Sequence, residues 1–222
     1  MGGVALAYPQ VAAAACPGCY GMVDVGEGIY VDDQMTAQER RQAIDVVTEA
    51  KHQVGEFFDG RWSDPRVLVC GTPECYGRIG GGEERGVAVM NRALMLSPKG
   101  VNTEIASHEL SHVELSARLE GAEVPQWFDE GLAVAVSDDP RWLKPVGEAD
   151  RCRASADEPL PHTLDDWLRE ASADNLLYAK AACEVVSWMD ENGGRPAVGE
   201  LVRRVASGEE FDQAYQDPLP KR

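Results

Sequence analysis

One five-residue segment, His108-Glu109-Leu110-Ser111-His112, constrains this chain more than any other feature of its sequence. It lies in a helix predicted from about Thr103 to Leu119, with Gly121 as the stop signal. Histidines four residues apart share one helix face, with Cβ atoms about 5–6 Å apart. Both imidazoles can therefore bind one zinc ion at about 2.0–2.1 Å. Glu109 lies about 100° around the helix, where it can face a water molecule without ligating the metal.

A catalytic zinc ion needs a third protein ligand and an open fourth position. Downstream, residues 125–133 read Pro-Gln-Trp-Phe-Asp-Glu-Gly-Leu-Ala and begin a second predicted helix. Charged side chains among aromatic residues and alanines require a partner. Glu130 can supply the third ligand from this helix. The alternative is that Asp129 and Glu130 cap the helix or face solvent.

The remaining pattern predicts an α+β fold. Thr36 and Glu39 form a capping-box pattern at the start of a helix predicted over residues 36–58. Strands are predicted at 66–70 and 86–96, a glycine-rich connector at 77–86, and further helices at 163–171, 174–191 and 196–207. Strands thus lie mostly before residue 97 and helices mostly after it. We therefore expect an N-terminal lobe with a small antiparallel sheet and a C-terminal helical lobe.

The length of 222 residues suits a single domain, expected over residues 16–216, with lobes at 16–121 and 122–216. Residues 1–15 are small and apolar and are interpreted as a flexible leader or the remnant of a trimmed signal peptide. They lack a basic n-region, so the sequence contains no clear signal peptide. No stretch approaches the roughly 18 apolar residues that would span a bilayer.

Six cysteines fall into two close pairs and one distant pair: Cys16 and Cys19, Cys70 and Cys75, Cys152 and Cys183. This usage favours disulfides and an exported protein, periplasmic or extracellular. A structural zinc ion held by the first four cysteines, or free thiols, are the alternatives. The sequence does not determine which cysteines pair.

The formal net charge is −17, which repels phosphate backbones, so nucleic acid is excluded as a partner. The acidic surface is interpreted as a solvated surface that aids solubility, with a preference for basic substrates as the alternative. No pattern indicates an oligomeric state.

The two motifs together resemble those of the gluzincins, the superfamily of thermolysin and aminopeptidase N, and are most similar to small bacterial peptidase-MA-like domains. The resemblance covers roughly Arg66 to Ala214. It implies a zincin-like fold in which His108, His112 and Glu130 ligate Zn²⁺. It also implies that Glu109 is the general base.

The segment Tyr178-Ala179-Lys180-Ala181 is similar to the Tyr-x-Lys-Gly stretch of aminopeptidase-N-like enzymes, with Ala181 in place of the glycine. The resemblance implies that Tyr178 stabilises the tetrahedral intermediate, because a phenol can donate to a developing oxyanion. Packing of Tyr178 in a helical core is the alternative, and Tyr76 and Tyr215 are less favoured candidates for the same role.

Two positions depart from the family pattern. Aminopeptidases of this group carry a glutamate that anchors the substrate amine, whereas the nearest stretch here is Val89-Met90-Asn91. Val134 replaces an aspartate that orients a histidine in thermolysin-like members, so Asp129, Asp138 or Glu104 is expected to take that part. The first departure favours an endopeptidase over an aminopeptidase.

The expected function is zinc-dependent hydrolysis of peptide or protein substrates. Glu109 takes a proton from the zinc-bound water and passes it to the leaving amine. The strand at residues 93–96 is expected to pair with the extended substrate, and the loop at 139–161 to lie over the site or between the lobes. The alternatives are a zinc-binding scaffold with little or no turnover and a zinc hydrolase of non-peptide amides.

Overall fold

The computed structural model describes residues 8–148, 150–156 and 158–217, which form two compact units. The first unit contains the described residues up to Gly55 together with Arg61–Glu114, and the second contains Glu56–Gly60 and the described residues from Leu115 onward. The division falls inside helix α5 (Thr103–Leu119) rather than after residue 121.

Contacts of the last turn of α5 explain this division. Arg118 donates a hydrogen bond to the Gly60 carbonyl at 2.7 Å, and its guanidinium lies 4.9 Å from the centre of the Phe58 ring. The end of the helix is therefore held by residues 56–60, which belong to the same unit.

The first unit contains a mixed five-stranded sheet among the described residues, in the order β1-β2-β3-β5-β4. Its strands are β1 (Met22–Gly26), β2 (Ile29–Asp32), β3 (Arg66–Val69), β4 (Gly86–Val89) and β5 (Ala93–Leu96). The two outer pairs are antiparallel, but β3 is parallel to both β2 and β5. The predicted antiparallel sheet is therefore wrong at its centre. Helices α3 (Ala37–Phe57) and α4 (Pro73–Arg78) lie in the long connections that parallel pairing requires.

The N-terminal segment is helical where a flexible leader was expected. Helix α2 (Pro9–Ala15) is followed by a short 3₁₀ helix, η1 (Pro17–Tyr20). Ala13 is fully buried in the core cluster on the sheet, and Gln10 donates to the Gly80 carbonyl at 2.9 Å. Proline at the first helical turn and the alanines after it favour this helix. Residues 1–7 of the expected leader lie outside the described residues.

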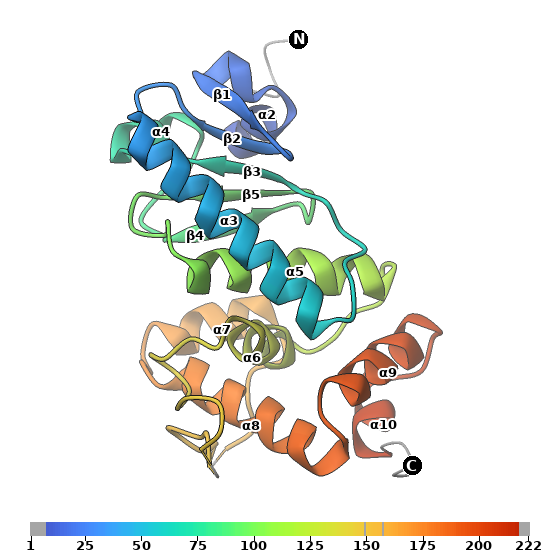
Figure 1. Ribbon diagram of the computed structural model, residues 1–222. Helices are drawn as coiled ribbons and strands as arrows, with labels where there is room; N and C mark the ends of the chain where they lie inside the picture. The colour runs from blue at the N-terminus through green and yellow to red at the C-terminus, as the bar shows by residue number, and fades with distance from the viewer. Residues whose placement is uncertain (1–7, 149, 157, 218–222) are drawn as a thin grey trace. The chain divides into compact units, whose positions relative to one another are not determined.

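Helix α3 has the predicted capping box. The backbone N–H of Thr36 donates to Glu39 Oε2 at 2.7 Å, and that of Glu39 donates to Thr36 Oγ1 at 3.3 Å. Ser107 of α5 donates to Gln53 of α3 at 2.9 Å, which fixes the two helices side by side (Figure 1).

The second unit is helical in its described residues, as expected for the C-terminal lobe. It contains α6 (Gln126–Ser137), α7 (Leu164–Ala171), α8 (Leu177–Asn192), α9 (Arg195–Ala206) and α10 (Phe211–Gln216). Helix α6 packs against α8 (Figure 1), and their closest approach is at Gly131. A methyl group on Gly131 would lie 2.7 Å from the carbonyl carbon of Ala181, so only glycine fits there.

All six cysteines form disulfides, Cys16–Cys19, Cys70–Cys75 and Cys152–Cys183. The structure therefore contains no four-cysteine metal site and no free thiols. Three disulfides are typical of proteins exported to an oxidising compartment. Among the described residues, no helix has the length and apolar character needed to cross a membrane.

Candidate metal site

Helix α5 presents His108 and His112 on one face. Their ring centres are 4.8 Å apart with an interplanar angle of 82°, and both side chains are half-buried. Asn102 caps the helix by accepting a hydrogen bond from the Ile105 N–H at 2.9 Å. Leu110 is buried in the turn between the histidines, so the helix is anchored by its apolar face while the imidazoles remain accessible.

Glu130 comes from the first half of α6 and is only 8% exposed. Its Oε1 accepts a hydrogen bond from Gln126 Nε2 at 3.1 Å. The start of α6 is fixed by backbone bonds from Gln126 to the His162 carbonyl at 2.9 Å and from Trp127 to the Pro161 carbonyl at 3.1 Å. The carboxylate is thus buried on a helix whose first turn is held in place.

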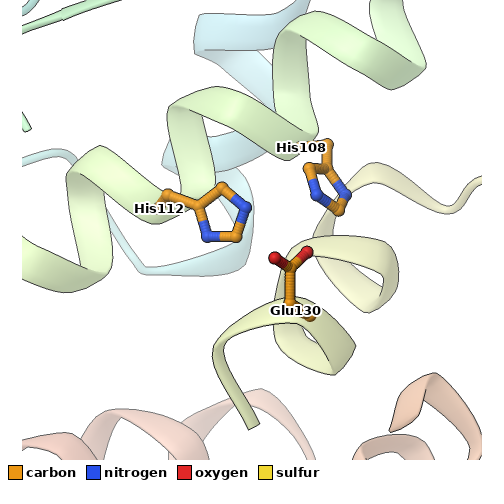
Figure 2. Close-up of side chains that lie close together, drawn as sticks. All are labelled: His108, His112 and Glu130. Carbon is orange, nitrogen blue, oxygen red and sulfur yellow. The ribbon is translucent and has the colours of Figure 1, made fainter. Parts of the chain in front are cut away.

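The three predicted ligands converge (Figure 2). One ligand atom from each of His108, His112 and Glu130 lies within 4.8 Å of the other two. Two imidazole nitrogens and a carboxylate oxygen are a donor set that fits zinc and leaves a fourth position open. This group could hold a metal ion.

Glu109 lies beside an outer strand of the sheet. A methyl group on Gly86, at the start of β4, would lie 2.8 Å from Glu109 Cγ and 3.0 Å from Ile105 Cγ2. The strand therefore passes α5 so closely that a larger residue at position 86 would displace the side chain of Glu109. Gly86 lies where the predicted glycine-rich connector meets the predicted strand at 86–96, and nothing in the sequence indicates its contact with Glu109.

Tyr178, the predicted oxyanion donor, lies in an aromatic stack. Its ring stacks on Trp142 with centres 5.5 Å apart at 21° and meets Trp167 edge-on at 5.0 Å and 87°. These contacts fit the alternative of a packed tyrosine. The catalytic role of Tyr178 stays a prediction.

Tyr76 is linked electrostatically to Glu109. Its hydroxyl donates to Glu84 Oε1 at 3.1 Å. The pKa of the Tyr76 phenol is raised above its usual range. Burial is the main cause, and the negative charges of Glu84 and Glu109 add to it. The phenol is therefore a proton-bearing donor near the general-base candidate.

Tyr215 lies among the rings of the second unit and donates to Glu184 at 3.4 Å. Burial foremost raises the pKa of its phenol. These contacts assign it a packing role.

The expected orienting carboxylates are only partly accounted for. Asp138 ends α6 in a left-handed conformation and forms an ion pair with Arg151, so it serves the loop after α6. Asp129 and Glu104 stay predictions. Gln126, one helical turn before Glu130, contacts a candidate ligand, and the i, i+4 spacing was the signal for this contact.

Replacing Gln126 by leucine is expected to lower metal affinity about 10- to 100-fold, because an outer hydrogen bond that orients the ligand carboxylate is lost. Competition with a chromophoric chelator measures the affinity. Gln42→Leu, at an exposed position of α3, is the matched control. Equal affinities for the two variants would contradict this role of Gln126.

A separate cavity of about 330 Å³ lies in the second unit. Its lining includes Leu160, Leu177, Glu158, Glu170, Asp174 and Lys180. It includes none of the predicted site residues, so this cavity is distinct from the candidate metal site. The loop at residues 139–161, expected to lie over the site or between the lobes, contributes part of the lining of this cavity. Ion pairs join Arg141 to Asp139 and Arg151 to Asp138.

No protein-family model matches the chain, and a search of the curated proteins gives no significant match. The structure itself defines the class: a disulfide-bonded protein of mixed helix and sheet, with a histidine–histidine–glutamate group able to hold a metal ion.

Proposed function

We propose that this chain is a zinc-dependent hydrolase of peptide bonds, with a zincin-like fold and an active site of the gluzincin type. The observation that carries the proposal is the convergence of His108, His112 and Glu130 within 4.8 Å. Glu109 follows the first of these ligands directly on the same helix. Two histidines, a remote glutamate and an adjacent carboxylate are the side chains that metal-assisted hydrolysis needs.

The residues have separate roles in this proposal. His108, His112 and Glu130 would hold the ion, and Gln126 orients the glutamate. A bound zinc ion supplies a Lewis acid that polarises a carbonyl and lowers the pKa of water. Glu109 accepts the proton of the attacking water and returns it to the leaving amine.

Strand β4 is the proposed binding surface for the substrate. It is the last strand of the described sheet on the side of β5, and its first residue, Gly86, packs against Glu109. An extended peptide can add to such an edge through backbone hydrogen bonds. The expectation that residues 93–96 bind the peptide is wrong, because β5 is already paired with β3 and β4.

An endopeptidase is favoured over an aminopeptidase. The stretch that would carry an amine-anchoring glutamate is Val89-Met90-Asn91. Val89 ends β4, and Met90 and Asn91 form the following turn with φ values of 48° and 52°. This turn carries no carboxylate that could bind the N-terminal amine of a peptide. The proposed site therefore does not require the scissile bond to lie next to the N-terminus of the substrate.

A zinc-binding scaffold without turnover is the second candidate function. The departure at Val134 favours it, because a buried valine stands where the resemblance expects a carboxylate that orients a histidine. Both candidate functions require zinc at the same site, but only the hydrolase turns over a substrate.

The test measures bound metal and the cleavage of a mixed peptide library by the full chain. We expect one zinc ion per chain, internal cleavage of peptides, loss of cleavage after chelation and recovery when zinc is restored. Zinc binding without cleavage of any peptide or small amide would support the scaffold. Cleavage of small amides alone would reassign the substrate, and absence of metal binding would overturn both proposals.

A further inference from the structure

The Cys16–Cys19 disulfide differs from the other two in exposure. Both of its residues are exposed, and only Pro17 and Gly18 separate them. Cys70 and Cys75 are fully buried, and Cys183 in the third disulfide is 8% exposed. A thiol in solution can therefore reach the first pair without opening the core. Cys70–Cys75 is shielded at both residues, whereas Cys152–Cys183 is shielded at Cys183 and half-buried at Cys152.

The pair also lies beside positive charge in an otherwise acidic protein. Arg66 Nη1 donates to the carbonyls of Ala14 at 2.8 Å and Ala15 at 3.2 Å, the two residues directly before Cys16. Arg78 donates to the Tyr20 carbonyl, directly after Cys19, at 2.9 Å, but it also pairs with Asp32. A guanidinium close to a cysteine stabilises its thiolate, and the cation bound to the two residues before Cys16 is the one that the inference assigns to this part.

Contacts other than the disulfide hold the chain on both sides of the pair. On the N-terminal side, Ala13 is buried and Gln10 bonds to Gly80. On the C-terminal side, Pro17 is buried and the Gly21 carbonyl accepts a hydrogen bond from the Asp33 N–H at 3.0 Å. The two thiols would therefore remain close after reduction, and the disulfide can re-form without refolding.

From these observations we infer that Cys16 and Cys19 form a redox-active thiol–disulfide exchange site for small-molecule thiols, separate from the proposed metal site. A thiolate attacks one sulfur, the Cys16–Cys19 bond breaks, and the second cysteine leaves as a thiolate that takes up a proton. A second thiolate attacks the mixed disulfide and releases the disulfide of the small thiol. Two electrons and two protons pass to the cysteines, and the reverse sequence oxidises them.

The test incubates the full chain with graded ratios of reduced to oxidised glutathione, followed by acid quench, alkylation and mass mapping of each cysteine. Cys16 and Cys19 are expected to reach half-reduction at a ratio at least about tenfold lower than the other cysteines. Circular dichroism of the partly reduced protein is expected to be unchanged. Reduction of all three pairs together, or of Cys16–Cys19 last, would overturn the inference and identify a purely structural disulfide.

Arg66→Gln tests the electrostatic part of the inference. We expect the initial rate of glutathione exchange at Cys16–Cys19 to fall several-fold, because the leaving thiolate loses its neighbouring cation. Arg41→Gln, at an exposed position of α3, is the matched control and should exchange at the wild-type rate. Equal rates for the two variants would contradict the role of Arg66.

Discussion

Glu109→Gln is expected to bind zinc as the wild type does while losing peptide hydrolysis by a factor of about 10³, or about 4 kcal/mol of transition-state stabilisation. The substitution removes a proton acceptor from the turn between His108 and His112 but leaves the three ligand side chains in place. Metal content, zinc affinity and the cleavage rate of a peptide selected from the library are measured on the same preparations.

His112→Ala is the companion variant, and it should lose both metal binding and activity. Glu49→Gln, an exposed carboxylate of α3, controls for loss of charge and should retain both. A Glu109→Gln protein that cleaves peptides at the wild-type rate would disprove the assigned general base. A Glu109→Gln protein that loses zinc would show that the glutamate belongs to the metal site instead.

Glu114→Ala is expected to destabilise the fold by about 3 kcal/mol, a large share of the typical total of about 5–15 kcal/mol. Glu114 is fully buried two residues after His112. Its carboxylate accepts hydrogen bonds from Trp62 N at 2.8 Å, Ser63 N at 2.9 Å and Ser63 Oγ at 2.6 Å. Truncation leaves these donors without their acceptor and opens space beside the helix that presents the histidines.

Urea unfolding, monitored by circular dichroism, measures the change in the free energy of unfolding. Glu104→Ala is the control, and its expected loss of stability is less than about 1 kcal/mol. Glu114→Gln should fall between wild type and Glu114→Ala, because it preserves the shape but removes the charge that strengthens the bonds. A loss no greater than that of Glu104→Ala would mean that the loop at residues 61–64 does not depend on this carboxylate.

The helices were predicted well where a local signal marks their ends. The boundaries of α5 were predicted, α3 begins at the predicted capping box, and Thr163 caps α7 by accepting a hydrogen bond from Asp166. Short elements were missed: β1, β2, α4 and α10 contain four to six residues each, so no periodic pattern develops.

The strand directions were not predictable in the same way. Strand β3 pairs with β2 and β5, and β2 lies more than 30 residues away in the chain. A run such as Ala-Leu-Met-Leu in β5 indicates burial on both faces of the sheet. It does not indicate which strands pair with β5. The small apolar composition of Pro9–Ala15 indicated a flexible leader or a signal-peptide remnant. In the structure this segment is a helix whose Ala13 is buried against the sheet.

The clustering of the candidate ligands was predictable in part, because the i, i+4 spacing of His108 and His112 determines their geometry once a helix forms. Glu130 depended on the packing of a second helix, which the sequence indicated only through an acidic residue in an apolar segment. The contact of Gly86 with Glu109 could not be predicted, since it follows from the position of β4 in the sheet.

The tight packing at Gly131 adds one residue to the sequence pattern that this site requires, besides the candidate ligands. The residue directly after Glu130 faces the backbone of Ala181 at a distance that excludes even a methyl group. A distant relative that keeps the two histidines and the glutamate but carries a larger residue here would have to separate α6 from α8 and thereby move the glutamate. A glutamate–glycine pair downstream of the histidine motif is therefore a physically grounded filter for recognising relatives of this chain.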